Sequence, residues 1–214
     1  HNKVFVQAES EVAAINMVYG AAGAGKRVMT SSSSPGIALK QEGISYIAGA
    51  ELPCVLVSVM RGGPGLGGIQ PSQADYFQIT RGGGNGDYRI ISFAPENLQE
   101  AVDLMKESFA IADAYRNPVM IAVDGLIGQM MEPVDLDRPI PNRKLQEKTW
   151  AVGTNYTNRP RNIINSLYLD PQDLENHNLD LQKKYQRAKD NEQRFEYINM
   201  ENPEYVIVAY GTTA

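Results

Sequence analysis

Two glutamates, Glu9 and Glu11, stand immediately before an alanine-rich run that has the composition of a helix. Carboxylates are favoured in the first turn of a helix because they face the positive end of its dipole. A carboxylate in this position can also transfer a proton or accept a hydrogen bond from a cofactor nitrogen. The residues alone favour the structural interpretation of this pair and leave the chemical one open.

A second candidate is Arg61, which is followed by five glycines within the seven residues 62–68. This run comes directly after a predicted buried strand, and ligands of parallel α/β sheets bind beyond the carboxyl ends of the strands. Glycines let a backbone pass close to a ligand, and a guanidinium can hold a carboxylate or a phosphate. We therefore favour a ligand-binding loop, with a tight surface turn as the alternative.

Two further polar or glycine-rich runs are ambiguous. Ser31 to Ser34 stand before Pro35, which is typical of a strand end followed by a helix N-cap, although the four hydroxyls could also face a ligand. The cluster Gly82–Asp87 precedes a predicted strand and is compatible with either a flexible loop or a binding loop.

Residues 20–26 match G-x-x-x-x-G-K, the first seven positions of a phosphate-binding P-loop. Position 27 is an arginine, where that motif needs a hydroxyl for Mg²⁺, and here a helix precedes the glycines instead of following them. We reject the P-loop and predict that the glycines end the helix, with Lys26 at its carbonyl end.

The elements that must position these residues alternate between short apolar strands and amphipathic helices. Such alternation predicts an α/β fold with a mainly parallel sheet and helices on both of its faces. Cys54 falls within one strand and is expected in the core. The predicted strands are Val4–Gln7, Arg27–Ser31, Leu52–Met60, Ile90–Phe93 and Val119–Val123, and the predicted helices cover residues 8–20, 37–48 and 98–112.

The last third of the chain differs in character. Residues 132–170 are rich in Pro, Asn and Arg and predict an extended connection, while Pro171 to Met200 predict a charged helix on which His177 is exposed. Tyr205–Tyr210 predicts a strand that opens a truncated second domain. We therefore divide the chain into an α/β domain (1–135), a linker with a charged helix (136–203) and the start of a second domain (204–214).

Composition excludes several function classes. The formal net charge of −5 offers no basic footprint for nucleic acid, and no apolar run is long enough to span a bilayer. One cysteine cannot form an internal disulfide or hold an iron-sulfur cluster alone, and two histidines leave little room for histidine chemistry. We expect a soluble, cytoplasmic protein without a metal site of its own.

Five motifs in order resemble one family, the thiamine-diphosphate-dependent 2-oxoacid:ferredoxin oxidoreductases, in the subunit that carries the pyrimidine-binding domain. The likeness covers roughly residues 4–135 and continues weakly to Tyr205. The run Ile69–Phe77 is more similar to the branched-chain, 2-oxoisovalerate type than to the 2-oxoglutarate type. The motifs are Gln7–Glu11, Thr30–Gly36, Met60–Pro64, Gln70–Asp75 and Gly83–Tyr88.

The resemblance implies roles for individual residues. Glu11 matches the glutamate that hydrogen-bonds N1′ of the cofactor's aminopyrimidine, and Arg61 matches an arginine near the carboxylate of the substrate. Ser33, Ser34, Gly62 and Gly63 fall in the motifs that are expected to contact the cofactor. The implied activity is oxidative decarboxylation of a 2-oxoacid, with transfer of the acyl group to coenzyme A and of electrons to ferredoxin.

The resemblance also implies what this chain lacks. The expected partners are a pyrophosphate-binding subunit, a gamma subunit and a ferredoxin-like subunit of an enzyme of anaerobic metabolism. The Mg²⁺ site and the [4Fe-4S] clusters are expected on these partner subunits. Family members begin earlier, with a Tyr-Pro-Ile-Thr-Pro motif, and continue further, so we expect a fragment that is inactive alone. The alternatives are a 2-oxoglutarate:ferredoxin oxidoreductase subunit and a non-catalytic interaction subunit of the same fold.

Overall fold

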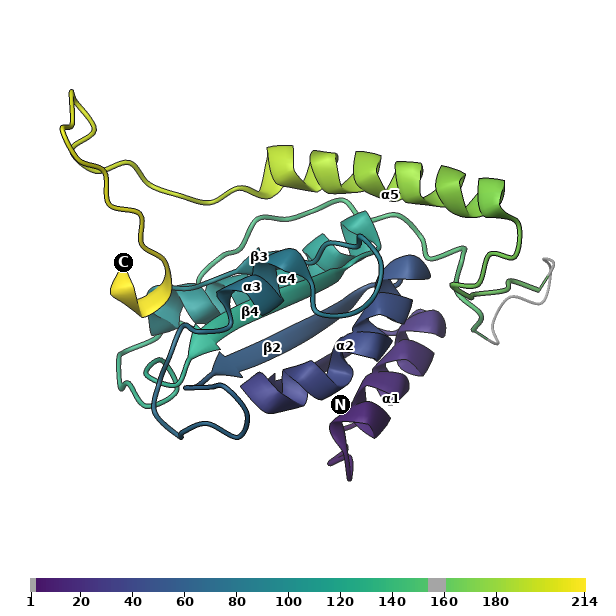
Figure 1. Cartoon of the computed structure of the whole chain (residues 1–214), viewed down its shortest axis with the longest axis horizontal. Coiled ribbons are helices and arrows are strands. Elements are labelled where there is room, and N and C mark those ends of the chain that lie inside the picture. Colours follow the sequence, from purple (N-terminus) through teal and green to yellow (C-terminus); the bar gives the residue numbers. More distant parts are fainter. Residues whose placement is uncertain (1–2, 154–160) are drawn as a thin grey trace.

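A computed structural model describes residues 3–153 and 161–214 of the chain, and it is built on one parallel sheet (Figure 1). The strand order is β1-β2-β4-β3, with every pairing parallel. The predicted mainly parallel sheet is therefore confirmed, although the first of these strands begins two residues later than predicted. The strands are β1 (Met29–Ser33), β2 (Cys54–Met60), β3 (Ile91–Phe93) and β4 (Pro118–Asp124).

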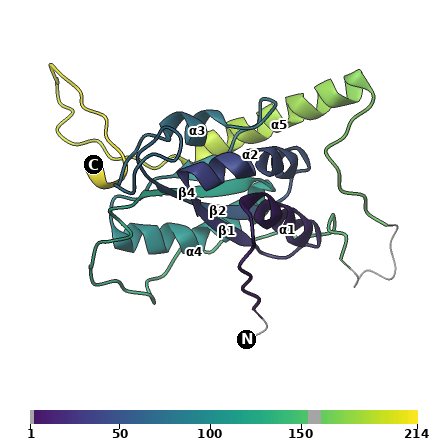
Figure 2. The ribbon, with the colours of Figure 1, turned by 60° about the horizontal axis from the view of Figure 1, so that its bottom comes forward.

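Helices cover both faces of the sheet, as predicted (Figure 2). One face is covered by α4, while α2, α3 and α5 lie over the other, and α1 packs beside α2. The short helix α3 has no counterpart in the sequence-based prediction. The helices are α1 (Glu11–Gly23), α2 (Ser34–Gly49), α3 (Tyr76–Arg81), α4 (Leu98–Tyr115), α5 (Pro171–Glu192) and the 3-10 turn η1 (Gly211–Thr213).

The central strand β4 divides the core into two layers. All seven of its residues are buried, because a parallel strand between two helical layers has no solvent face. Met120 belongs to the cluster shared with α1 and α2, whereas Ile121 belongs to the cluster under α4. Cys54 is buried as predicted, and its burial raises the pKa of the thiol to about 12.

Helix α1 begins at Glu11, three residues later than predicted, and ends at the glycines as predicted. The side chain of Ser10 accepts a hydrogen bond from the backbone N–H of Ala13 at 3.2 Å. After the last turn, Gly25 adopts φ +81°, and the amides of Gly25 and Lys26 donate to the carbonyls of Ala22 and Ala21 at 2.8 and 3.1 Å. These two bonds form a Schellman motif, so the glycines end a helix and the rejection of the P-loop is confirmed.

The charged helix α5 is held to the domain by a sparse apolar face. Leu181, Tyr185 and Ala188 are buried, and the helix ends at Glu192, eight residues earlier than expected for a helix reaching Met200. His177 is half-buried, which corrects its assignment as an exposed residue. The His177 ring faces the carbonyl end of α2, and its Nε2 lies 2.8 Å from the carbonyl oxygen of Gly49. The ring also stacks on Tyr168.

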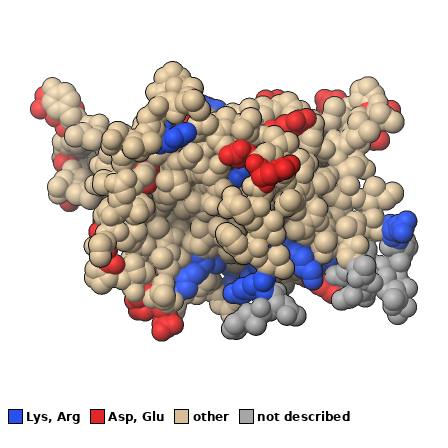
Figure 3. Space-filling model, turned by 90° about the horizontal axis from the view of Figure 1, so that it is seen from below, with Lys and Arg blue, Asp and Glu red and all other residues tan. Residues whose placement is uncertain are grey.

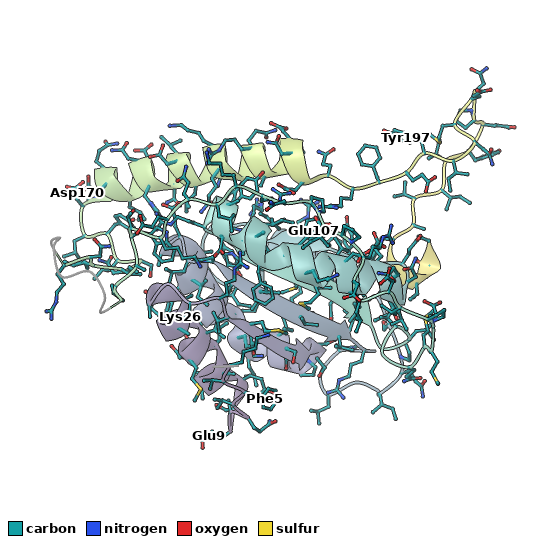
Figure 4. All side chains as sticks on the ribbon, turned by 180° about the vertical axis from the view of Figure 1, so that it is seen from behind. Phe5, Glu9, Lys26, Glu107, Asp170 and Tyr197 are labelled. Carbon is teal, nitrogen blue, oxygen red and sulfur yellow. The ribbon has the colours of Figure 1, made fainter. Side chains whose placement is uncertain are left out.

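Two predicted strands are wrong. Val4–Gln7 forms no strand, and Val4 and Phe5 are 88% and 93% exposed at the N-terminal tip (Figure 4). Tyr205–Tyr210 is also outside the sheet, with Ile207 92% exposed. An apolar run becomes a strand only where a neighbouring backbone pairs with it, and no described strand pairs with either run.

The connection predicted over 132–170 is without helix or strand where it is described; its residues 154–160, like residues 1 and 2, lie outside the described part. On the face in Figure 3, basic and acidic side chains form small separate groups among other residues. Across the described ranges, no helix is both long and apolar enough to cross a membrane.

Candidate functional site

The carboxyl edge of the sheet brings together the ends of β1 and β2. The hydroxyl of Ser34, which begins α2, accepts a hydrogen bond from the Arg61 amide at 3.0 Å and lies 3.4 Å from the Arg61 carbonyl oxygen. This hydroxyl ties the start of α2 to the loop after β2. Two residues predicted for the site are therefore in contact, and Ser33 precedes them as the helix N-cap, without a side-chain cap bond in the described structure.

Glu11 reaches the same edge from the first turn of α1. It is half-buried, whereas Glu9 is exposed and lies at the N-terminal tip (Figure 4). A Cβ added to Gly36 would stand 2.9 Å from both Cγ and Oε1 of Glu11 and would overlap the hydroxyl of Ser32. Gly36 thus makes room for the carboxylate of Glu11, which was predicted for the site, and for the hydroxyl of Ser32, which was not among the assigned site residues.

Lys40 lies one helical turn beyond Gly36 and is only 1% exposed. Its ammonium donates to Thr30 Oγ1 at 2.8 Å and to the Ser31 carbonyl at 3.1 Å. Burial lowers the pKa of Lys40, and the charge of Glu11 acts in the opposite direction. Sequence reasoning missed this residue, although the signal was present: a lysine stands between Ile37 and Ile44 on the apolar face of the helix.

The loop after β2 is closed on itself. Arg61 pairs with Pro71, the Gly62 amide donates to Gln70 at 3.1 Å, and the Gly68 amide donates to Gly62 at 2.8 Å. Gly67 has φ +57° and faces the Gly62 carbonyl so closely that a side chain would collide with it. Glycine is therefore required at position 67 by the fold of the loop itself.

Two groups of this loop are left open. Apart from the adjacent residues of the chain, no described atom lies within 4 Å of a Cβ built on Gly62 or Gly63. The Nε of Arg61 is buried without a hydrogen-bond partner among the described residues. A buried guanidinium N–H without an acceptor is energetically costly. An anionic ligand beside the glycine backbone could supply that acceptor.

The second glycine cluster serves packing. A Cβ on Gly84 would stand 2.5 Å from the backbone oxygen of Gln41, and Ser45 donates to Asn85 at 2.9 Å. Tyr88 donates to the side chain of Gln41 at 2.9 Å and accepts from the Gly84 amide at 3.1 Å. The cluster is fastened to α2, so its glycines allow close approach of two backbones.

Asp124, at the end of β4, was also missed by the sequence analysis. One carboxylate oxygen accepts from the amides of Leu126 and Ile127 at 2.9 and 3.3 Å, and the other accepts from Thr212 and, at 3.5 Å, from Gln73. One oxygen of Asp124 therefore stabilises the turn after β4, and the other binds η1 at the carboxyl edge. We assign it a structural role.

The edge fits an organic, anionic ligand. Glu11 offers a carboxylate and the serines offer hydroxyls, and the Nε of Arg61 has no hydrogen-bond partner among the described residues. In the described ranges, no group of three or more His, Cys, Asp or Glu side chains is arranged to hold a metal ion. The fold is of the parallel α/β class, in which ligands bind beyond the carboxyl ends of the strands.

The chain belongs to the family described as pyruvate flavodoxin/ferredoxin oxidoreductase, thiamine diphosphate-binding, whose model matches residues 1–200. This confirms the resemblance drawn from the five motifs. The ketoisovalerate oxidoreductase subunit VorB of Methanothermobacter marburgensis is 54% identical over 98% of this chain, which spans 59% of that relative. The chain therefore spans little more than half the length of this curated relative.

More distant relatives act on a different 2-oxoacid according to their names. The 2-oxoglutarate synthase subunit KorA of Methanothermobacter thermautotrophicus is 42% identical over 66% of this chain and 38% of its own length. A solved 2-oxoglutarate:ferredoxin oxidoreductase from Magnetococcus marinus, with 2-oxoglutarate, coenzyme A and succinyl-CoA bound, matches with a TM-score of 0.72 and 29% identity. That match covers 92% of this chain and 38% of the solved one.

Proposed function

We propose that this chain is the pyrimidine-binding part of a 2-oxoisovalerate:ferredoxin oxidoreductase subunit, which converts a branched 2-oxoacid to its acyl-CoA with thiamine diphosphate. The observation that carries the proposal is the half-buried carboxylate of Glu11 at the carboxyl edge, fitted against Gly36. The family match and the 54% identity to a ketoisovalerate oxidoreductase subunit support the substrate class.

The residues at the edge have separable tasks in this proposal. Glu11 shares a proton with N1′ of the aminopyrimidine and so controls its tautomer, while Arg61 binds the carboxylate of the 2-oxoacid. Ser33 and Ser34 supply hydroxyls, and the backbone of Gly62 and Gly63 allows close approach of the cofactor. Thiamine diphosphate, when bound, supplies the carbon nucleophile and the electron sink.

The remaining parts belong to partners in the same proposal. A pyrophosphate-binding subunit would hold Mg²⁺, and a gamma subunit and a ferredoxin-like subunit with [4Fe-4S] clusters would complete a cytoplasmic complex that uses coenzyme A. The single cysteine within residues 1–214 is buried, which supports cluster ligation outside this part of the protein. We also propose the division into residues 1–135, 136–203 and 204–214, and an enzyme that is inactive without its partners.

A 2-oxoglutarate:ferredoxin oxidoreductase is the second candidate, favoured by the KorA relatives and by the solved structure. Reduction of a viologen by the full-length chain co-expressed with its partner subunits distinguishes the two. We expect the highest kcat/KM with 2-oxoisovalerate, compared with 2-oxoglutarate and pyruvate. A preference for 2-oxoglutarate would establish the second candidate, and no turnover of any of the three would contradict the enzyme and leave the non-catalytic subunit.

A further inference from the structure

Gln73 contacts three segments of the chain that are far apart in the sequence. Its side-chain amide donates to the carbonyl of Tyr210 at 2.9 Å and lies 3.5 Å from the Asp124 carboxylate. Its side-chain oxygen accepts from the hydroxyl of Thr213 at 3.1 Å, and its backbone carbonyl accepts from the hydroxyl of Tyr210 at 3.0 Å. These contacts, the Gln73 joint, connect the loop after β2, the end of β4 and the C-terminal segment 210–213.

The C-terminal segment is held at the carboxyl edge of the sheet. Figure 1 shows η1 at the end of the sheet towards which the arrows of β2 and β4 point. Thr212 donates to the carboxylate of Asp124. Gly211 has φ +61°, and a Cβ added to it would stand 2.8 Å from the side-chain nitrogen of Gln73. The segment therefore fits closely against Gln73 and leaves no room for a side chain between them.

The same glutamine closes the loop that carries Arg61. Met60, the last residue of β2, pairs with Asp124 at the end of β4. The chain leaves β2 through Arg61, pairs with it again at Pro71 and reaches Gln73 two residues later. Gln73 then contacts Asp124, the strand partner of the residue before Arg61. The loop is thus fixed at its start by the sheet and at its end by the Gln73 joint.

We propose that Gln73 is a positioning residue, which couples the C-terminal segment to the position of Arg61 and thereby sets the affinity for the carboxylate of the 2-oxoacid. The inference rests on the role of Arg61 in the proposed function. The Nε of Arg61 has no hydrogen-bond partner among the described residues, so the backbone of the loop directs this group. A glutamine suits the joint, because its amide donates and accepts hydrogen bonds at the same time.

Loss of the joint should weaken substrate binding more than the chemical step. The side chain in Gln73→Leu has a similar size but makes none of the side-chain hydrogen bonds of the joint. We expect KM for the 2-oxoacid to rise about tenfold, which is a usual magnitude for coupling between two sites, with a change in kcat of less than about twofold. A glutamine that only supports folding would lower the yield of active complex without moving KM.

The test measures viologen reduction by the full-length chain assembled with its partner subunits, with whichever of 2-oxoisovalerate and 2-oxoglutarate the wild type prefers. Thr213→Val accompanies Gln73→Leu, because Thr213 is exposed and belongs to the C-terminal side of the joint. This variant removes the hydroxyl that bonds Gln73, so KM should rise about fivefold. A KM equal to the wild-type value in either assembled variant overturns the proposal.

Exchange of backbone amides with deuterium tests the joint without turnover. In the full-length chain the amides of Gly62 and Gly68 donate within the loop, so their protection reports its closure. Mass spectrometry of peptides that cover residues 61–70 should show about tenfold faster exchange in Gln73→Leu and Thr213→Val than in the wild type. Equal exchange overturns the coupling. A wild type that turns over no 2-oxoacid contradicts the proposed function instead and does not change the expected exchange.

Gln182 provides a matched control. It is an exposed glutamine on α5, and its side-chain amide donates to the carbonyl of Asp87 at 3.3 Å, at the end of the second glycine cluster. Gln182→Leu therefore removes a glutamine hydrogen bond from the loop that is packed on α2. KM and the exchange of residues 61–70 should equal the wild-type values. A rise in KM as large as that of Gln73→Leu would overturn the assignment, because the effect would not be specific to the joint.

Discussion

Two loops of the molecule begin with the same three residues, Arg-Gly-Gly, at positions 61–63 and 81–83. In the first loop the guanidinium Nε is buried and unpaired among the described residues, and the next two glycines have open space around them. In the second loop Arg81 is exposed, and a side chain at Gly83 or Gly84 would collide with Gln41. One sequence pattern thus serves two purposes, an open binding edge and a tight packing contact.

The difference lies in what stands opposite each loop. The first leaves the carboxyl end of β2, where the Arg61 amide donates to the hydroxyl of Ser34 at the start of α2. The second crosses the middle of α2, and its glycines let the two backbones approach. Substitutions in the first region should therefore change chemistry, and substitutions in the second should change stability.

The largest expected effect belongs to the open edge. Glu11→Gln removes the proton-sharing carboxylate, so C2 exchange of the bound cofactor in the assembled complex should fall by about 10³-fold, without loss of assembly. Glu9→Gln is the matched control, because Glu9 is the exposed acid two residues away. Exchange is measured by quenched-flow NMR. Equal exchange in Glu11→Gln and in the wild type would show that the carboxylate is misassigned.

Arg61→Ala tests the other charged group of the edge. Loss of a charge-assisted hydrogen bond to the substrate carboxylate should raise KM for the 2-oxoacid by roughly 10- to 100-fold, with a smaller change in kcat. Arg81→Ala, at the equivalent place in the second loop, should leave KM unchanged. Steady-state viologen reduction measures both. Equal losses in the two variants would remove the distinction between the loops.

Gly84→Ala tests the packed loop through stability. The added Cβ would meet the Gln41 backbone oxygen at 2.5 Å, and overpacking of this kind destabilises by about 2 kcal/mol. Gly62→Ala adds the same methyl group where no described atom lies within 4 Å, so its free energy of unfolding should change by less than about 0.5 kcal/mol. Urea denaturation of the full-length chain compares them. A loss at Gly62 as large as that at Gly84 would contradict the comparison.

Much of this arrangement could be predicted from local sequence. The buried strands β2 and β4 and the glycine end of α1 depend on residues that are neighbours in the chain. Val4–Gln7 and Tyr205–Tyr210 were misassigned because a strand also depends on a partner backbone that the run itself does not specify. The five family motifs, by contrast, identified the family without knowledge of the fold.

The site was only partly predictable for the same reason. Glu11, Ser34 and Arg61 lie in motifs, and the parallel sheet brings the ends of their elements to one edge. Lys40 was missed because its surroundings depend on how α2 packs under β1. The composition of the two Arg-Gly-Gly loops does not predict which loop is open and which is packed, because this depends on whether the loop contacts α2.

The smallest expected effect concerns a single hydroxyl in the packed loop. Tyr88 is 5% exposed, and its hydroxyl joins the Gly84 amide to the side chain of Gln41. Tyr88→Phe keeps the ring and leaves both groups without this partner, so the free energy of unfolding should fall by about 1 kcal/mol. C2 exchange in the assembled complex should stay at the wild-type rate, because the hydroxyl fastens the loop to α2 and the carboxylate of Glu11 is untouched. A Tyr88→Phe variant with full stability and slow exchange would place the second loop in the catalytic site and reverse the roles assigned to the two loops.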